Sequence, residues 1–211
     1  MWESIPTAGR ITDPDLLAFF ERRVQRTAEE FELDREGWPS EARLHWHDGP
    51  PRRSIIPGDP SGCLIYLRRG IDWPHACFQL AHETTHSVLC PNHVVFEWVQ
   101  EMFAIHVSLR ALLEIDAGDY AEAAIEQFLR EDQEASLTTA EMMEADLEQG
   151  YPPGLYPRAF LVGCELIEGV GWERVRPLGG LFDSRGKHDM SAWVETLDLD
   201  EAKVVQQILE L

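Results

Sequence analysis

The pentapeptide His82-Glu83-Thr84-Thr85-His86 constrains this chain more than any other feature of its sequence. It lies inside an apolar run, and on a helix the positions i and i+4 share one face. Both imidazoles can then converge on one metal ion, while Glu83 stands beside the open coordination position. The sequence therefore predicts a helix at this point, and the question of function becomes mainly a question of a metal.

The residues around the motif predict a helix from about Trp73 to Leu89. Asp72 is suited to the N-cap position, and Pro74 is tolerated in the first turn, where its missing N–H costs nothing. Small and apolar residues recur along the segment with helical spacing, which is typical of a buried helix. Cys90-Pro91-Asn92 is expected to end it.

A second apolar helix is predicted from Val94 to Leu113, and two carboxylates, Glu97 and Glu101, interrupt its apolar run one turn apart. Buried carboxylates are costly unless they are paired or bind a metal ion. A catalytic zinc ion commonly takes two His and one Glu as ligands and a water molecule in the fourth place. Either carboxylate could complete such a set.

The segment Trp98-Val99-Gln100-Glu101-Met102-Phe103-Ala104 resembles the W-L-N-E-G-F-A that follows H-E-x-x-H in the gluzincin metallopeptidases, in the branch around the aminopeptidase N-like enzymes. The match covers the Trp, the Glu, the Phe and the Ala. The resemblance implies a zincin-like fold and a zinc ion bound by His82, His86 and Glu101. The alternative third ligand is Glu97, and Glu101 would then accept a hydrogen bond from a ligand histidine.

The interval between His86 and Glu101 is 14 residues, which is shorter than the family's usual interval and implies a trimmed connecting loop. Glu101 is preferred over Glu97 because the second helix needs its first turn to reach back across that short loop.

A second resemblance begins at Tyr156-Pro157-Arg158-Ala159 and looks like the Y-x-K-G segment of the same enzymes. In those relatives the Tyr hydroxyl donates to the oxyanion that forms at the scissile carbonyl, and Tyr156 is the matching position. Tyr151 is the alternative. The simpler interpretation is a surface Tyr before a helix whose start Pro157 marks.

Departures from the family limit what the resemblance implies. Its Lys-Gly pair is here Arg158-Ala159, and the Gly after the ligand Glu is Met102. The G-x-M-E-N segment that recognises a free amino terminus is missing from the sequence, so aminopeptidase activity is not implied. The resemblance covers roughly residues 65–178.

The predicted function is zinc-dependent hydrolysis of peptide bonds, with one Zn²⁺ per chain and a peptide or protein as substrate. The zinc ion would activate a water molecule and polarise the carbonyl, while Glu83 would accept and return the proton. Three alternatives stay open. They are a zinc-binding or peptide-binding relative without turnover, a zinc hydrolase of small amides, and an α-helical interaction protein with an accidental motif.

Composition favours one domain over residues 1–211, since 44% of the residues are hydrophobic and no Gly- or Ser-rich linker divides the chain. A net charge of −20 argues against nucleic-acid binding, which basic patches drive. Neither a leader nor an apolar run near twenty residues is evident, so no membrane association is expected. The cysteines form no C-x-x-C pair and fit reduced thiols in the cytoplasm: Cys63, Cys77, Cys90 and Cys164.

The expected fold is α+β, with a small mixed or antiparallel sheet packed on the zinc-site helix and a mostly helical C-terminal half. Residues 1–70 would form the N-terminal helix and the sheet, residues 71–113 the zinc-site helices, and residues 114–211 a helical subdomain. The expected N-terminal elements are a helix from Pro14 to about Glu32 and strands at Ala42–His47, Ser54–Ile56 and Cys63–Arg69.

The stretch from Glu114 to Glu148 holds twelve carboxylates and one Arg. It is read as a solvated helix face, with a docking surface for a cationic partner as the alternative. Among the remaining histidines, His45 and His47 share one face of a predicted strand, where a second metal is conceivable but hydrogen-bonded or surface histidines are favoured. Structural roles are expected for His93, His106 and His188.

Overall fold

The computed structural model describes residues 9–33, 41–56, 59–89, 97–145 and 151–209. These residues group into two compact units. The first comprises Met1–Asn92 and Val107–Gly118, and the second His93–His106 and Asp119–Leu211. The expectation of a single domain over residues 1–211 stays a prediction.

The first unit contains a sheet of four strands in the order β1-β2-β4-β3. The strands are β1 (Gly9–Arg10), β2 (Glu41–His47), β3 (Arg52–Ile56) and β4 (Asp59–Arg68). β2 runs parallel to β4, whereas β1 pairs antiparallel with β2 and β3 pairs antiparallel with β4. The sheet is therefore mixed, and the coarse α+β prediction is confirmed. β1 was not predicted, because two residues are too few to show an alternating pattern.

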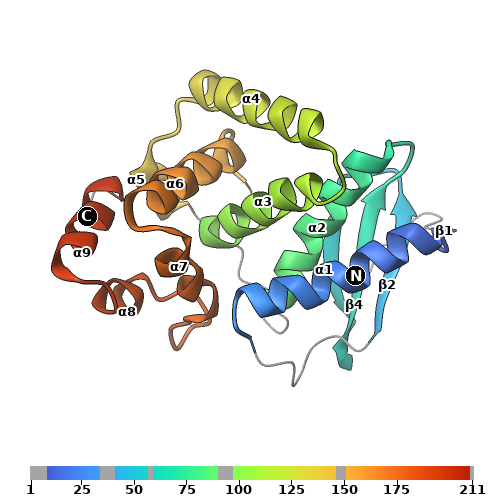
Figure 1. Cartoon of the computed structure of the whole chain (residues 1–211), viewed down its shortest axis with the longest axis horizontal. Helices are drawn as coiled ribbons and strands as arrows, with labels where there is room; N and C mark the ends of the chain where they lie inside the picture. Colours follow the sequence, from blue (N-terminus) through green and yellow to red (C-terminus); the bar gives the residue numbers. More distant parts are fainter. Residues whose placement is uncertain (1–8, 34–40, 57–58, 90–96, 146–150, 210–211) are drawn as a thin grey trace. The chain divides into compact units, whose positions relative to one another are not determined.

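Two helices, α1 (Pro14–Glu30) and α2 (Trp73–Leu89), cover one face of this sheet (Figure 1). α1 begins at Asp13, whose Oδ1 accepts the backbone N–H groups of two residues in the first turn. Asp72 has the same role for α2, because its Oδ1 accepts the N–H of His75 at 3.0 Å. The predicted bounds of α2 and its cap are thus confirmed.

The core of the first unit lies between the sheet and these helices. Alternate residues of β2 and β4 point inward, as the period of a half-buried strand requires. The buried set includes Ile11, Leu16, Phe19, Leu44, Ile65, Leu67, Cys77 and Leu80. Gln79 of α2 also bonds to the sheet, because its Oε1 accepts the N–H of Arg68 at 3.0 Å. Apolar burial and this polar contact together fix α2 against β4.

The second unit is helical, apart from a single β-bridge between Phe182 and His188 in its described part. It comprises the first part of α3 (Trp98–Leu113), α4 (Gly118–Ala135), α5 (Thr139–Glu144), α6 (Leu155–Val170), α7 (Trp172–Val175), the 3₁₀ helix η1 (Arg176–Gly180), α8 (Met190–Glu195) and α9 (Leu199–Ile208). α6 packs against α5, α7 and α9. α3 begins later than the predicted Val94, and residues 94–96 lie outside the described residues.

A close approach of α3 and α6 depends on Gly163. A Cβ atom at this position would lie 2.4 Å from Nε2 of His106 and 2.7 Å from Cγ of Met102. The imidazole of His106 occupies the space beside Gly163, and its Nε2–H donates to the carbonyl oxygen of Phe160 at 3.1 Å. His106 therefore joins the two helices, in line with the structural role expected for it.

The cysteines and the apolar character of the helices also bear on the expectations from the sequence. Cys63, Cys77 and Cys164 are free thiols, whereas Cys90 lies outside the described residues. None of the described helices combines the length and the apolar character that crossing a membrane requires.

Candidate metal centre

His82 and His86 lie one turn apart on α2, and their Nε2 atoms are 3.1 Å from one another. The ring centroids are 4.8 Å apart at an angle of 76°. Two nitrogens that bind one tetrahedral zinc ion at about 2.0–2.1 Å stand about 3.3 Å apart. The two imidazoles are therefore spaced almost as they would be around a shared metal ion.

Contacts within the first unit hold this pair in place. The ring of Phe78, one turn earlier on α2, stacks on His82 with 6.5 Å between the ring centroids. Arg53 of β3 donates from Nη1 to the carbonyl oxygen of His86 at 2.8 Å. The motif end of α2 is thus attached to the neighbouring strand β3.

The polar residues between and after the histidines bond back to their own helix. Thr85 Oγ1–H donates to the carbonyl oxygen of Ala81, and Ser87 Oγ–H donates to that of Glu83, each at 2.8 Å. These hydroxyls are buried, and a buried hydroxyl without a hydrogen bond would be costly. The back-bonding explains how a stretch with several polar residues can be buried as a helix.

Glu83 follows His82 directly and is only 6% exposed. It is the single carboxylate of the described α2, and it lies in the turn that carries both imidazoles. A carboxylate with little access to bulk water, beside two metal-ligand candidates, is suited to moving a proton within an active site. Glu83 is therefore a buried carboxylate in the same turn as the two histidines, and its role as general base stays a prediction.

Glu101 lies in the first turn of α3 and is 2% exposed. Tyr151 Oη–H donates to its Oε1 at 3.2 Å. The ring of Tyr151 stacks on that of Tyr156, with 5.5 Å between the centroids and 14° between the planes. The hydroxyl that contacts Glu101 thus belongs to Tyr151. In the sequence analysis Tyr151 is the alternative to Tyr156 as the oxyanion donor.

The two tyrosines are brought together by the turn at Gly154, which has φ +86°. A Cβ atom at Gly154 would lie 2.4 Å from Cβ of Ala135, so a side chain is excluded both by conformation and by space. α6 begins at the next residue and carries Tyr156 in its first turn. The Pro-Pro-Gly sequence before it signals a turn, although not the stacking that results.

Glu97, the alternative third ligand, has another partner. Its Oε2 accepts the backbone N–H of His188 at 2.8 Å and the Nδ1–H of the same residue at 2.7 Å. The His188 side chain is 1% exposed. This pairing gives Glu97 a structural reason to be there that does not involve a metal ion.

Among the side chains that the structure describes, those of His82, His86 and Glu101 are the candidate ligands of a metal ion; the two histidines belong to the first unit and Glu101 to the second. Each offers one ligand atom, an imidazole nitrogen or a carboxylate oxygen. Two imidazoles and one carboxylate suit zinc, and they also suit other first-row transition metals. The arrangement accordingly fits a metal site without fixing which metal occupies it.

The other histidines have different surroundings. His45 and His47 share a sheet face, as predicted, and both pack against the ring of Tyr66 at centroid distances of 5.7 and 5.6 Å. Arg52 covers the same ring, with its Cζ 5.1 Å from the centroid. His93 lies outside the described residues. No local sequence pattern indicates the roles of Arg53 and Gly154, apart from the turn signal at the glycine.

Comparison with protein-family models finds no match to this chain, and comparison with curated protein sequences finds none either. The likeness to the gluzincins therefore rests on the motif residues quoted above.

Proposed function

We propose that this protein is a zinc-dependent metallopeptidase that hydrolyses peptide bonds, with His82, His86 and Glu101 as zinc ligands and Glu83 as general base. The observation that carries the proposal is the 3.1 Å separation of the Nε2 atoms of His82 and His86 on a buried helix. Burial of Glu101, whose carboxylate is the third candidate ligand, supports it.

A bound zinc ion would supply Lewis acidity and would lower the pKa of a water molecule toward neutrality. Glu83 would accept a proton from the attacking water and would return it to the leaving nitrogen, the usual role of a buried carboxylate base. Because Glu83 has little contact with bulk water, the proton it holds stays available for the second transfer.

The two stacked tyrosines have different roles in the proposed mechanism. Tyr151 positions Glu101 through the hydrogen bond to Oε1. Tyr156, about 38% exposed, donates its hydroxyl proton to the oxyanion of the tetrahedral intermediate. An oxyanion donor of this kind contributes about 3 kcal/mol to transition-state stabilisation.

An extended substrate would pair with β3. β4 lies between β2 and β3 and is a central strand, whereas β3 is an edge strand of the sheet. Arg53 joins this strand to the carbonyl oxygen of His86 and so keeps it beside the motif. Addition of a peptide strand to a sheet edge supplies backbone hydrogen bonds that do not depend on the peptide's sequence.

Elemental analysis of chelator-washed protein tests the metal site. We expect one zinc ion per chain in the wild type and loss of zinc in both His82→Ala and Glu101→Ala. His45→Ala, which removes an imidazole that packs on Tyr66, serves as the matched control and should retain zinc. A wild-type protein without zinc would overturn the proposal.

Cleavage of a peptide library tests the chemistry. Glu83→Gln should retain zinc and lose at least about 100-fold in turnover, since a general base contributes roughly 10²–10⁴-fold. A Glu83→Gln variant with full activity would exclude the proposed mechanism.

The same proposal places the protein in the cytoplasm, because Cys63, Cys77 and Cys164 are free thiols and a reducing compartment keeps thiols in that state. Cell fractionation with a thiol count on the recovered protein tests this point, and recovery from an oxidising compartment would contradict it.

A further inference from the structure

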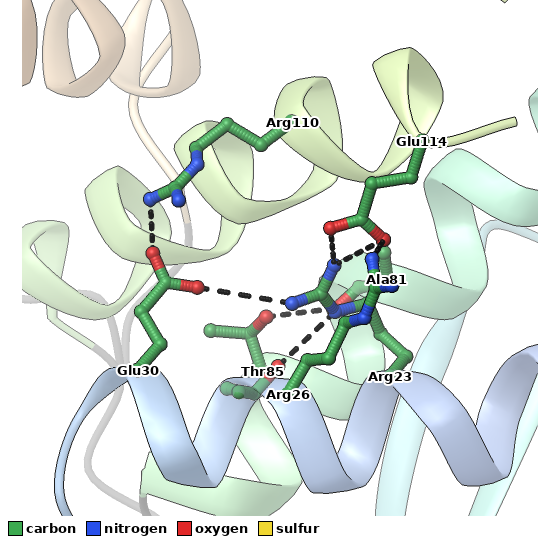
Figure 2. A network of polar contacts seen from close by, with 8 residues as sticks. Arg23, Arg26, Glu30, Ala81, Thr85, Arg110 and Glu114 are labelled. Atoms are coloured by element: carbon green, nitrogen blue, oxygen red, sulfur yellow. Dashed lines mark hydrogen bonds and ion pairs between the residues drawn. The ribbon is translucent and has the colours of Figure 1, made fainter. Parts of the chain in front are cut away.

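Arg23 of α1 is the centre of a network of ion pairs in the first unit (Figure 2). Its side chain is 3% exposed, which is rare for an arginine. Nη1 lies 3.1 Å from both carboxylate oxygens of Glu114, and Nη2 lies 3.7 Å from Oε2 of Glu30. Nε–H donates to Oγ1 of Thr27 at 3.3 Å. The guanidinium is therefore held on every side.

Two more arginines contact the same carboxylates. Nη1 of Arg26 lies 2.6 Å from Oε2 of Glu114, and Arg110 pairs with Glu30. Three guanidinium groups thus meet two carboxylates, and this network carries an excess of positive charge although the whole chain has a net charge of −20.

A hollow of about 60 Å³ opens beside the network. Its walls combine three arginines and one carboxylate with two apolar side chains: Phe19, Arg22, Arg23, Arg26, Glu114 and Ile115. This volume is enough for a few water molecules or one small anion. Three guanidinium groups against one carboxylate leave an excess of two positive charges around it.

We propose that this hollow binds a small oxyanion of the phosphate class. Guanidinium groups present two parallel N–H donors that match a carboxylate or a phosphate, and such charge-assisted bonds are stronger than neutral ones. The two carboxylate oxygens of Glu114 accept from Arg23 and Arg26, so these guanidinium groups already bind one anionic group beside the hollow.

The three arginines have different parts in this site. Arg23 is buried and fixed by its contacts, so it forms the rigid wall. Arg26 is 52% exposed and can turn toward a ligand while Glu114 keeps its two contacts with Arg23. Arg22 lines the same hollow and is exposed. Phe19 and Ile115 reduce the local polarity, which strengthens the attraction between the guanidinium groups and an anion.

Binding of inorganic phosphate at constant ionic strength, followed by NMR of the arginine Nε–H signals, tests the proposal. We expect saturable binding to the wild type and an affinity roughly fivefold lower or more in Arg22→Ala and in Arg26→Ala, since a charge-assisted contact contributes about 1 kcal/mol or more. Arg130→Ala, on the exposed surface of α4, removes the same charge and should bind phosphate as the wild type does.

Glu114→Gln gives a test in the opposite direction. It removes the carboxylate that competes for the guanidinium groups, so phosphate affinity should rise roughly three- to tenfold. Comparison of inorganic phosphate with phosphoserine then identifies the ligand: tighter binding of the first assigns the site to the free ion, and tighter binding of the second to a phosphate ester. Absence of saturable binding to the folded wild type, or equal affinities in Arg22→Ala, Arg26→Ala and Arg130→Ala, would overturn the proposal.

Discussion

Tyr151 and Glu101 are joined by a hydrogen bond of 3.2 Å, in which the phenol is the donor and Oε1 of the carboxylate the acceptor. Glu101 is buried, and a buried carboxylate needs such partners. Partners of metal-binding side chains also fix the orientation of the ligand and influence metal affinity.

Replacement of Tyr151 by Phe should therefore weaken zinc binding by about 10-fold or more, the range found for partners of ligand residues. Tyr156→Phe is the matched control because it removes the stacked hydroxyl of the same turn. It should keep the zinc affinity and lower kcat by about 100-fold. Competition with a chromophoric chelator measures the affinity, and peptide cleavage measures kcat. If Tyr151→Phe binds zinc as tightly as the wild type, Tyr151 does not position the ligand.

Arg23→Ala should destabilise the protein by about 3 kcal/mol or more, because it leaves Glu114 and Glu30 without their buried partner. Arg26→Ala removes the neighbouring, half-exposed arginine and should cost about 1 kcal/mol or less. Urea unfolding of the two variants beside the wild type gives both values. Equal losses of unfolding free energy in the two variants would mean that the buried ion pairs of Arg23 contribute no more than the exposed one of Arg26.

Glu30 links stability to pH. Burial raises the pKa of its carboxyl above the usual 4.5, and the charges of Arg110 and Arg23 offset only part of that effect. The folded state then holds the proton more tightly than the unfolded state does, so this contribution favours folding below pH 4.5 and is lost as the pH rises through the raised pKa. The free energy of unfolding of the wild type, measured relative to Glu30→Gln, should fall between pH 4 and pH 7. A rise over that range would contradict the assignment.

Gly163→Ala should destabilise the second unit by about 1–3 kcal/mol, because its Cβ would overlap His106 and Met102 of α3. Gly118→Ala is the control. A Cβ at Gly118 would meet only Cδ2 of Leu113 at 3.9 Å, an ordinary contact, so this variant should be neutral or slightly stabilising. Thermal unfolding compares the two, and a stable Gly163→Ala would show that α3 and α6 can separate without cost.

The thiol of Cys77 should resist alkylation in the folded protein. Its residue is fully buried, and burial raises the pKa of the thiol to about 12, so little thiolate exists near neutral pH. Cys164, which is half-buried, should react first among the described thiols. Mass spectrometry after timed alkylation distinguishes the sites. Rapid labelling of Cys77 would mean that α1 and α2 separate readily.

Local signals explain most of what could be predicted from the sequence. The bounds of α2 follow from Asp72 at its start and from the apolar spacing, both of which depend on neighbours within a few residues. The spacing of His82 and His86 follows from the helix repeat in the same way. β1, with two residues, carries no periodic signal, and its existence depends on pairing with His45 and Trp46 far along the chain.

Side-chain partners that are distant in sequence could not be predicted. Glu97 and Glu101 are equivalent by spacing, and what separates them is that Glu97 bonds to His188, 91 residues later. The network around Arg23 has the same character, because its partner Glu114 is also 91 residues away. The choice of Tyr151 as the partner of Glu101 depends on a contact across 50 residues.

The place of β4 in the sheet has a consequence for the order in which the first unit opens. β4 is hydrogen-bonded along both of its edges, to β2 and to β3, and α2 packs against it. Each amide of β4 exchanges with deuterium only after its own hydrogen bond to β2 or β3 has broken, so the whole strand exchanges only after both neighbours have separated, whereas the two residues of β1 are paired on one side. The amides of β4 are therefore expected to exchange last in the first unit. α2, which carries the two imidazoles, packs against this strand and is thus supported by the part of the unit that unfolds last.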